Sequence, residues 1–411
     1  MRALFSLLSL PALAAAANLY VSHYNGNVYS LALTSIPGAQ RRNEEAAAVN
    51  YTLTQTAALK TCGSMPSWLT FDASTRVLYC SDETGDSTSP GSLTALAAST
   101  DGKLSEIAKV DTIGGGVNNV IYNRDDGKKF IAIAHYEGSA LSTFPLPLKS
   151  NTQPLQTFNF TLSKPGAVPS RQDAPHPHQV FLDPTGTFLL SPDLGSDLVR
   201  VYRIEPNSGS LKECPGINVT PGTGPRHGTF WTPGASSLRL RKQRRSLAET
   251  VLYIVGELGN KVTAYSVTYD MKSNCLGFNE TQALYPYPNG TALPSGASVA
   301  EIRLEQPYLY ISIRSDHAFP PNDSLATLQQ NNTGGLSFQR LSSSYGTVPR
   351  TFAINKEGDL VAIGNQASSN VAIVQRDPHT GQLGNEVASL AVGDPGTVGA
   401  AEGLSSVIWE E

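Results

Sequence analysis

The sequence predicts an all-β fold built from seven repeats of a strand–turn–strand unit. The clearest copy, "HPHQVFLDPTGTFLLSPDLGSDLVRVYRIEPNSGSL" (His176 to Leu211), alternates short apolar strands with turns rich in Gly, Pro, Asp and Ser. The unit recurs along the chain at steps of 51 to 64 residues. No stretch shows a sustained 3.6-residue apolar period, which argues against helices. A repeat of this length suits a four-stranded antiparallel blade, so we predict a seven-bladed β-propeller.

The second strand of each repeat is the easiest to align, because it starts with apolar residues and ends in a polar one. Its copies are LYVSHY (Leu19 to Tyr24), LYCSDE (Leu78 to Glu83), FIAIAH (Phe130 to His135), FLLSPD (Phe188 to Asp193), LYIVGE (Leu252 to Glu257), LYISIR (Leu309 to Arg314) and LVAIGN (Leu360 to Asn365). Seven copies predict seven blades.

A shorter strand precedes most of these copies. The candidates are PSWLTFD (from Pro66), VNNVIYN (from Val117), PHQVFLD (from Pro177), PRHGTFW (from Pro225), PRTFAIN (from Pro349) and, more weakly, ASVAEIRLE (from Ala297). The N-terminal repeat lacks such a strand, and LSSVIWE (Leu404 to Glu410) can supply it. The C-terminal strand would then close the ring and remove the exposed sheet edges.

The N-terminus has the pattern of a secretory signal peptide over residues 1–17, followed by the propeller over 18–411. Arg2 precedes a short apolar run, and Ala15-Ala16-Ala17 offers a cleavage site before Asn18. We therefore expect a secreted protein. Seven glycosylation sequons agree with secretion: Asn50, Asn159, Asn218, Asn279, Asn289, Asn322 and Asn331.

Composition limits the partners of the chain. Only 16% of the residues are charged and the net charge is −4, which gives no sign of a nucleic-acid partner. No segment has about 18 uninterrupted apolar residues, so we expect no membrane span. We expect a monomer that binds a small molecule and needs no cofactor.

Four cysteines in a secreted chain predict two disulfides, for which three connectivities exist. Cys214 and Cys275 follow corresponding strands of successive repeats, so they could face each other across neighbouring blades. Cys62 would then pair with Cys80. The segment of about residues 235–249, with "LRLRKQRRS", interrupts the fourth hairpin as a basic surface insertion, and Arg244-Arg245 is a possible processing site.

In a hairpin, residues at equal distances before and after the turn lie opposite each other. This count, here called hairpin arithmetic, places polar residues in two rings at one mouth of the central channel. The first-strand ring contains Ser67, Asn118, His178, Arg226, Ser298, Arg350 and Ser405. The second-strand ring contains Tyr24, Glu83, His135, Asp193, Glu257, Arg314 and Asn365. Such residues could simply fasten neighbouring blades. However, paired arginines are suited to a carboxylate, a phosphate or a developing oxyanion, and a nearby His or Glu can move a proton. An anionic ester or lactone fits that set.

Several motifs resemble one family of proteins. They are HPHQVFLDPTG, GPRH, ELGNKV, ISIRSD and VPRTFAINKEGDLVAIGNQASSNVAIVQRDPHTGQL. In combination they look like the seven-bladed lactonase propellers, which include the bacterial-type 6-phosphogluconolactonase and the fungal carboxy-cis,cis-muconate cyclase. The resemblance extends from about Asn18 to Glu410 and is strongest from His176 onward.

The resemblance implies a catalytic set of one His, two Arg and one Glu. By motif these roles fall on His178, Arg226, Glu257 and Arg314, all members of the two rings. We assign substrate binding to the neighbouring polar residues His176, Asp193, His227, Arg350, Glu83 and His135. The sequence departs from the family where "SDHAFPPND" follows Arg314 and where Ile313 replaces a common Asn, so the shape of the substrate pocket is open.

Three functions remain open on this basis. The first is a metal-independent lactonase, in which Arg226 and Arg314 polarise the carbonyl or hold an acidic group, and His178 or Glu257 activates water. The second is a cycloisomerase acting on a muconate-like anion. The third is a secreted propeller that binds a ligand without catalysis. Secretion argues against 6-phosphogluconate chemistry, since phosphosugar lactones are made in the cytosol.

Other catalytic centres find less support in the sequence. Glu83, Asp193 and Asn365 are potential calcium ligands, but the interspersed arginines oppose a cation. His176 and His178 have no third ligand at zinc spacing. A Ser-His-Asp triad lacks its G-x-S-x-G elbow.

Overall fold

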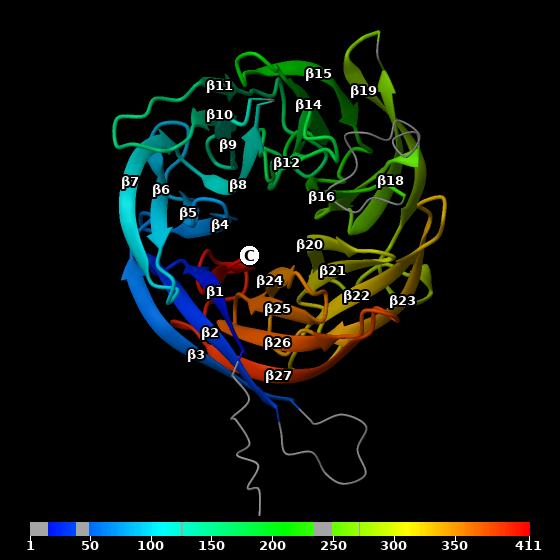
Figure 1. The fold of residues 1–411 in the computed structure, drawn as a ribbon. Helices are drawn as coiled ribbons and strands as arrows, with labels where there is room; N and C mark the ends of the chain where they lie inside the picture. Colours follow the sequence, from blue (N-terminus) through cyan, green and yellow to red (C-terminus); the bar gives the residue numbers. More distant parts are fainter. Residues whose placement is uncertain (1–14, 38–48, 125, 234–248, 271) are drawn as a thin grey trace, which may run out of the picture.

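Seven four-stranded antiparallel sheets form the blades of a propeller in the computed structural model, which describes residues 15–37, 49–124, 126–233, 249–270 and 272–411 (Figure 1). Blades 1 to 3 consist of β4 (Pro66–Asp72), β5 (Val77–Asp82), β6 (Pro90–Ala98) and β7 (Leu104–Ile113); β8 (Gly116–Asn123), β9 (Lys129–His135), β10 (Ala140–Pro145) and β11 (Gln156–Asn159); and β12 (Phe181–Leu182), β13 (Phe188–Asp193), β14 (Leu198–Ile204) and β15 (Leu211–Asn218).

Blades 4 to 6 consist of β16 (Pro225–Trp231), β17 (Val251–Gly256), β18 (Lys261–Asp270) and β19 (Cys275–Leu284); β20 (Ser298–Glu305), β21 (Tyr308–Arg314), β22 (Ser324–Gln330) and β23 (Leu336–Ser343); and β24 (Pro349–Ile354), β25 (Leu360–Asn365), β26 (Asn370–Arg376) and β27 (Leu383–Ala391). A short 3₁₀ turn, η3 (Pro288–Gly290), follows β19. The predicted all-β, seven-bladed architecture is confirmed.

Blade 7 joins the two ends of the chain. It consists of β1 (Ala15–His23), β2 (Asn27–Pro37), β3 (Val49–Lys60) and β28 (Leu404–Trp409). β28 is the innermost strand, and it pairs antiparallel with β1 from Leu19↔Trp409 to His23↔Leu404. In Figure 1 the red C-terminal strand lies beside the blue N-terminal strands. The predicted closure by the C-terminal strand is therefore confirmed.

The hydrophobic core lies between neighbouring blades. One cluster combines Leu19 and Leu31 of blade 7 with Ala362 and Ile373 of blade 6. Another combines Tyr253 and Val262 of blade 4 with residues of blade 5. Because side chains alternate across a strand, each blade buries apolar residues against both of its neighbours. This packing fixes the inner strands around the axis of the ring.

A β-bulge interrupts the innermost strand of every blade. In five blades the pairing register isolates one residue at the inner end of that strand, namely Ser67, Val117, Arg226, Arg350 and Ser405. In blades 3 and 5 the register slips by one residue between Pro177 and Phe181 and between Val299 and Ile302. A bulge leaves one residue unpaired and re-aims its side chain. The same device therefore recurs seven times around the ring.

The bulges correct one detail of the predicted first-strand ring. We expected Asn118 opposite His135, but His135 pairs with Gly116 and the unpaired residue is Val117. Asn118 instead accepts a hydrogen bond from the backbone N–H of Val180, so it fastens blade 2 to blade 3. Ser298 pairs with Arg314, as the two rings predict, and the bulge of β20 falls further along the strand, at Ala300 and Glu301. A one-residue slip cannot be counted from sequence spacing alone.

Both disulfides connect the predicted cysteines. Cys62 bonds Cys80 and thereby ties the β3–β4 connection to blade 1, while Cys214 bonds Cys275 and joins the outermost strands of blades 3 and 4. The second pair closes a sequence separation of 61 residues. A cross-link of this length restricts the unfolded chain substantially.

Replacing Cys214 and Cys275 together by serine should lower the free energy of unfolding by about 4 kcal/mol, the loop-closure value for this separation. Both cysteines are only half-buried, so the serines should cause little packing loss. Urea unfolding of the oxidised protein and the double variant measures the difference. A change below about 1 kcal/mol would show that the cross-link contributes no such restriction.

Some predicted features fall largely outside the described residues. Most of the basic insertion at about 235–249 is one, and most of the predicted signal peptide (1–17) is another, although Ala15–Ala17 pair with Leu33–Ser35 at the start of β1. Of the sequon asparagines, Asn322 is half-buried and the other six are exposed. Glycosylation and secretion stay predictions. No helix within the described ranges is long and apolar enough to cross a membrane.

Candidate active site

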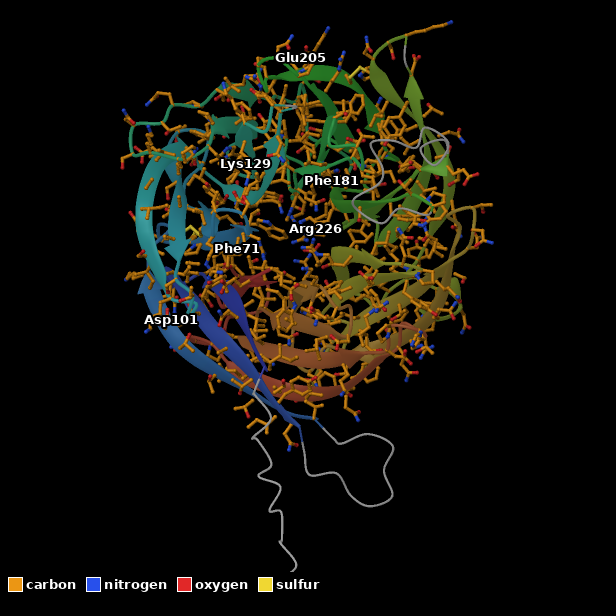
Figure 2. The ribbon with its side chains drawn as sticks, viewed as in Figure 1. Phe71, Asp101, Lys129, Phe181, Glu205 and Arg226 are labelled. Carbon is orange, nitrogen blue, oxygen red and sulfur yellow. A yellow bond between two sulfur atoms is a disulfide. The ribbon has the colours of Figure 1, made fainter. Side chains whose placement is uncertain are left out.

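Glu257 is the centre of an arginine cluster at the inner ends of blades 4 and 5. It follows β17, where the backbone N–H of Glu257 donates to the carbonyl of Gly224. Its Oε2 lies 2.8 Å from Nε of Arg226, and its Oε1 lies 3.1 Å from Nη2 of Arg314. Arg171 reaches the same Oε1 at 2.8 Å. One carboxylate therefore faces three guanidinium groups. Figure 2 shows Arg226 near the axis of the ring.

These contacts decide the charge states of the cluster. Burial alone would raise the pKa of Glu257, but Arg314, Arg226 and Arg171 outweigh burial and hold that pKa well below 4.5. Burial and the neighbouring Arg314 lower the pKa of Arg226 to about 9, against the opposing effect of Glu257. Glu257 is thus a permanent anion and a poor base at neutral pH. Arg226 is a cation short of negative charge.

A second group surrounds Glu83 at the end of β5. Oε2 of Glu83 accepts hydrogen bonds from Ser67 Oγ at 2.6 Å and from Tyr24 Oη at 2.5 Å. Arg350 Nη2 lies 3.4 Å from the same oxygen, and its guanidinium lies over the ring of Tyr24 at 5.4 Å. Hairpin arithmetic therefore placed Ser67 with Glu83 correctly, as it did Arg226 with Glu257, whereas the contact of Tyr24 with Glu83 joins two blades.

His178 lies among aromatic rings beside the arginine cluster. Its ring makes edge contacts with Tyr136 at 5.5 Å and with His227 at 5.2 Å. Nδ1 is buried and has no hydrogen-bond partner in the described part of the chain. Burial, Arg226, His227 and Arg350 lower the pKa of His178 well below 6.5. A neutral imidazole therefore stands next to surplus positive charge.

His227 is a second buried imidazole and is paired with a buried acid. Its Nδ1 lies 3.2 Å from Oε1 of Glu301, the residue that the bulge in β20 displaces. The ring of Trp68 packs edge-on against His227 at 5.6 Å, although Trp68 belongs to blade 1 and His227 to blade 4. Burial lowers the pKa of His227 to about 4, against the effect of Glu301. Trp68 thus makes a contact between blades 1 and 4 across the middle of the ring.

Three of the predicted substrate-binding residues lie apart from the two acid–arginine groups. Asp193 is fully buried and is held by Arg200 at 2.7 Å and by Ser196 at 2.9 Å. His135 is fully buried, with Nε2 at 2.7 Å from Ser142 Oγ of its own blade. His176 stacks on Tyr136 at 4.2 Å. These contacts hold their blades. Of the three residues, only His176 contacts Tyr136, whose ring also contacts His178.

Three members of the site were missed from the sequence. Arg171 comes from the irregular β11–β12 connection, which matches no repeat. Glu301 is hidden in a strand that lacks the initial proline of four other candidate first strands. Trp68 looked like an ordinary strand residue, and its contact with His227 appears only when the ring is closed. The basic residue of "PSRQD" at 169–173, in a loop just before the HPHQ motif, was the one available signal.

In the part of the chain that the structure describes, no group of three or more His, Cys, Asp or Glu side chains could hold a metal ion. Each acid of the two groups has an arginine within 4 Å instead.

The sequence profile described as "Lactonase, 7-bladed beta-propeller" matches residues 19–400. The chain belongs to this family of lactonase propellers. A probable 6-phosphogluconolactonase of Arthroderma benhamiae is 32% identical over 331 residues, or 80% of this chain and 78% of that one. The 6-phosphogluconolactonase of Bacillus subtilis is 28% identical over 262 residues, covering 63% and 66% of the two chains. The periplasmic gluconolactonase of Pseudomonas aeruginosa has the same fold, with a TM-score of 0.71 at 23% identity over 96% of this chain and 99% of that one.

The buried histidines predict a loss of stability in mild acid. The folded-state pKa values of His135 and His227 are lowered to about 4, against 6.5 without burial. Between pH 6.5 and 4 the unfolded chain therefore binds more protons than the folded one, so stability falls as the pH falls. We expect each histidine to contribute about 3 kcal/mol to the loss in the free energy of unfolding.

Urea unfolding at pH 7, 5.5 and 4 measures this loss. His135→Asn should start from a lower stability, because it loses the bond to Ser142, but should lose less stability on acidification. Parallel curves for the variant and the wild type would contradict the assignment.

Proposed function

We propose that this protein is a metal-independent lactonase that hydrolyses a lactone carrying an acidic group. The observation that carries this proposal is the charge balance of the site. Five arginines (Arg171, Arg226, Arg303, Arg314 and Arg350) face three glutamates (Glu83, Glu257 and Glu301), which leaves a surplus of two positive charges in a chain of net charge −4. Nε of Arg314 is buried without a hydrogen-bond partner among the described residues. Buried donors are normally hydrogen-bonded, so this one is suited to bind an acceptor atom of a ligand.

The reaction needs a stabilised oxyanion and a proton acceptor. Attack of water on the lactone carbonyl forms a tetrahedral oxyanion, which Arg226 and Arg314 are suited to stabilise as planar cationic donors. His178 takes the proton of the attacking water. When the ring C–O bond breaks, the imidazolium returns that proton to the leaving alkoxide, and the product is a hydroxy acid. Glu257 keeps the arginines in place through its ion pairs with Arg226 and Arg314.

The pKa of His178 gives this mechanism a distinctive pH dependence. A base with a pKa well below 6.5 is already neutral throughout the physiological range. kcat/KM should therefore stay level between about pH 8 and 6.5 and fall only in more acidic solution. Buffer-matched initial rates measure the profile. An inflection near pH 7 would show that another group is the base.

A hydrolysis screen of sugar and aromatic lactones tests the activity itself, with and without a chelator. Turnover that survives the chelator supports the proposal, while turnover lost with the chelator contradicts its metal independence. Ring closure of a carboxymuconate without lactone hydrolysis would instead assign cycloisomerase chemistry to the same arginines. If no compound of the panel is turned over, both the lactonase and the cycloisomerase assignments are overturned, and a binding protein remains.

A further inference from the structure

The β11–β12 connection is an ordered loop that contacts three blades. Residues 160–180 contain no strand, only an isolated bridge between Pro177 and Asp193, and β12 begins at Phe181. Gln172 is fully buried and clasps the loop, since its Oε1 accepts from the N–H of Val168 and its Nε2 donates to the carbonyl of Leu194. Ser139 of blade 2 donates to the carbonyl of Pro175. The loop is thereby fixed at the rim of the arginine cluster.

Arg171 is the residue next to this clasp, and it is directed into the site. Its Nη2 lies 2.8 Å from Oε1 of Glu257 and 3.3 Å from the hydroxyl of Tyr136. Tyr136 in turn contacts the ring of His178. Arg171 therefore touches both the acid that organises the cluster and the aromatic ring that packs on the candidate base.

Exposure distinguishes Arg171 from the other two arginines on Glu257. Its side chain is 43% exposed, against 15% for Arg314 and 2% for Arg226. Arg171 and Arg314 share one carboxylate oxygen, so neither has a carboxylate of its own. An anion that approaches from solvent meets Arg171 first. It can replace Glu257 as the partner of Arg171 without displacing a buried side chain.

We propose that Arg171 is a specificity-determining residue that binds the acidic substituent of the lactone, while Arg226 and Arg314 act on the carbonyl. This inference rests on the proposed function. The shared chemistry of the substituent is a pair of anionic oxygens, from a carboxylate or a phosphate, which the planar guanidinium can bind with two donors. Arg171 belongs to a loop and not to a blade, so substrate preference is carried by an element outside the repeats.

Three lactones separate recognition from chemistry: neutral glucono-1,5-lactone, its 6-phosphate, and glucarolactone with a carboxylate. A lost charge-assisted contact raises KM about 10- to 100-fold. Arg171→Ala should show that rise for at least one acidic lactone, with kcat within about threefold and little change for the neutral lactone. The acidic lactone that responds identifies the substituent. Lys164→Ala, which removes an exposed cation from the same loop, is the matched control and should behave as wild type.

Two outcomes would overturn the inference: equal loss on neutral and acidic lactones, which means that Arg171 only supports Glu257, or no loss on any of them. If the wild type hydrolyses none of the lactones, the proposed function fails, and calorimetry with 6-phosphogluconate and glucarate decides recognition separately. Wild-type binding that weakens at least tenfold in Arg171→Ala keeps Arg171 as an anion-binding residue. Absence of binding, or equal binding by both proteins, overturns it.

Discussion

Replacing Arg226 by alanine should lower kcat/KM for lactone hydrolysis about 10²- to 10³-fold, the usual effect of removing one donor from an oxyanion site. Arg226 is almost completely buried, so no solvent cation can take its place. It is anchored by Glu257 Oε2 and by the carbonyl of Ala300, to which Nη1 donates at 2.8 Å. Its position is therefore fixed before substrate arrives. Arg226→Lys should rescue little of the loss, because an ammonium lacks the planar pair of donors.

The control for this variant must separate activity from folding, since Arg226→Ala also leaves Glu257 with one partner fewer. Arg200→Ala removes a comparable ion pair, from the fully buried Asp193, at a place outside the cluster. It should lower the melting temperature while keeping kcat/KM within about threefold of wild type. If Arg226→Ala stays folded and retains full turnover on a verified substrate, these arginines fasten blades and do not catalyse.

Removing Leu404–Glu411 should abolish the folded state. The deletion takes away β28 and exposes the edge of β1, and it also removes the buried side chains of Leu404, Val407 and Trp409. Their burial is worth about 5 to 9 kcal/mol at 1.5–3 kcal/mol per side chain, which is comparable to the whole stability of a typical protein. The bonds of Glu410 to Asn18 and Tyr20 are lost as well.

Circular dichroism melting and limited proteolysis of the truncated and full-length proteins measure this effect. Deleting Glu411 alone is the control, because it leaves all of β28 in place and removes a residue whose described contact is the backbone N–H of Lys356. A cooperative transition in the longer truncation, close to that of wild type, would show that the ring does not depend on this strand.

The number and order of blades could be predicted because each second strand repeats the same pattern of apolar residues followed by a polar end. The strand boundaries agree closely: PRHGTFW was expected from Pro225, and β16 spans Pro225–Trp231. β12 was the main exception. PHQVFLD suggested seven residues, but only Phe181–Leu182 pair in register, because the bulge and the loop anchored by Gln172 take up the earlier part.

The site was only partly predictable, for a different reason. Hairpin arithmetic works within one blade, so it brought Arg226 to Glu257 and Ser67 to Glu83. It cannot describe contacts across the ring, such as Trp68 with His227. Nor does it apply to Arg171, which lies in a connection of no regular structure. Polar spacing also does not tell a ligand-facing acid from one enclosed by its own blade, as with Asp193.

The seven bulges bear on the evolvability of this fold. Of the five residues that the register isolates, only Val117 belongs to an apolar cluster between blades; Ser67, Arg226, Arg350 and Ser405 do not. New chemistry can therefore be tried at these positions without repacking the propeller, provided that a charged residue changes together with its second-strand partner, as Arg226 with Glu257. The hairpin pair, not the single residue, is then the unit of exchange, and a library randomised pair by pair should yield more folded variants than one randomised residue by residue.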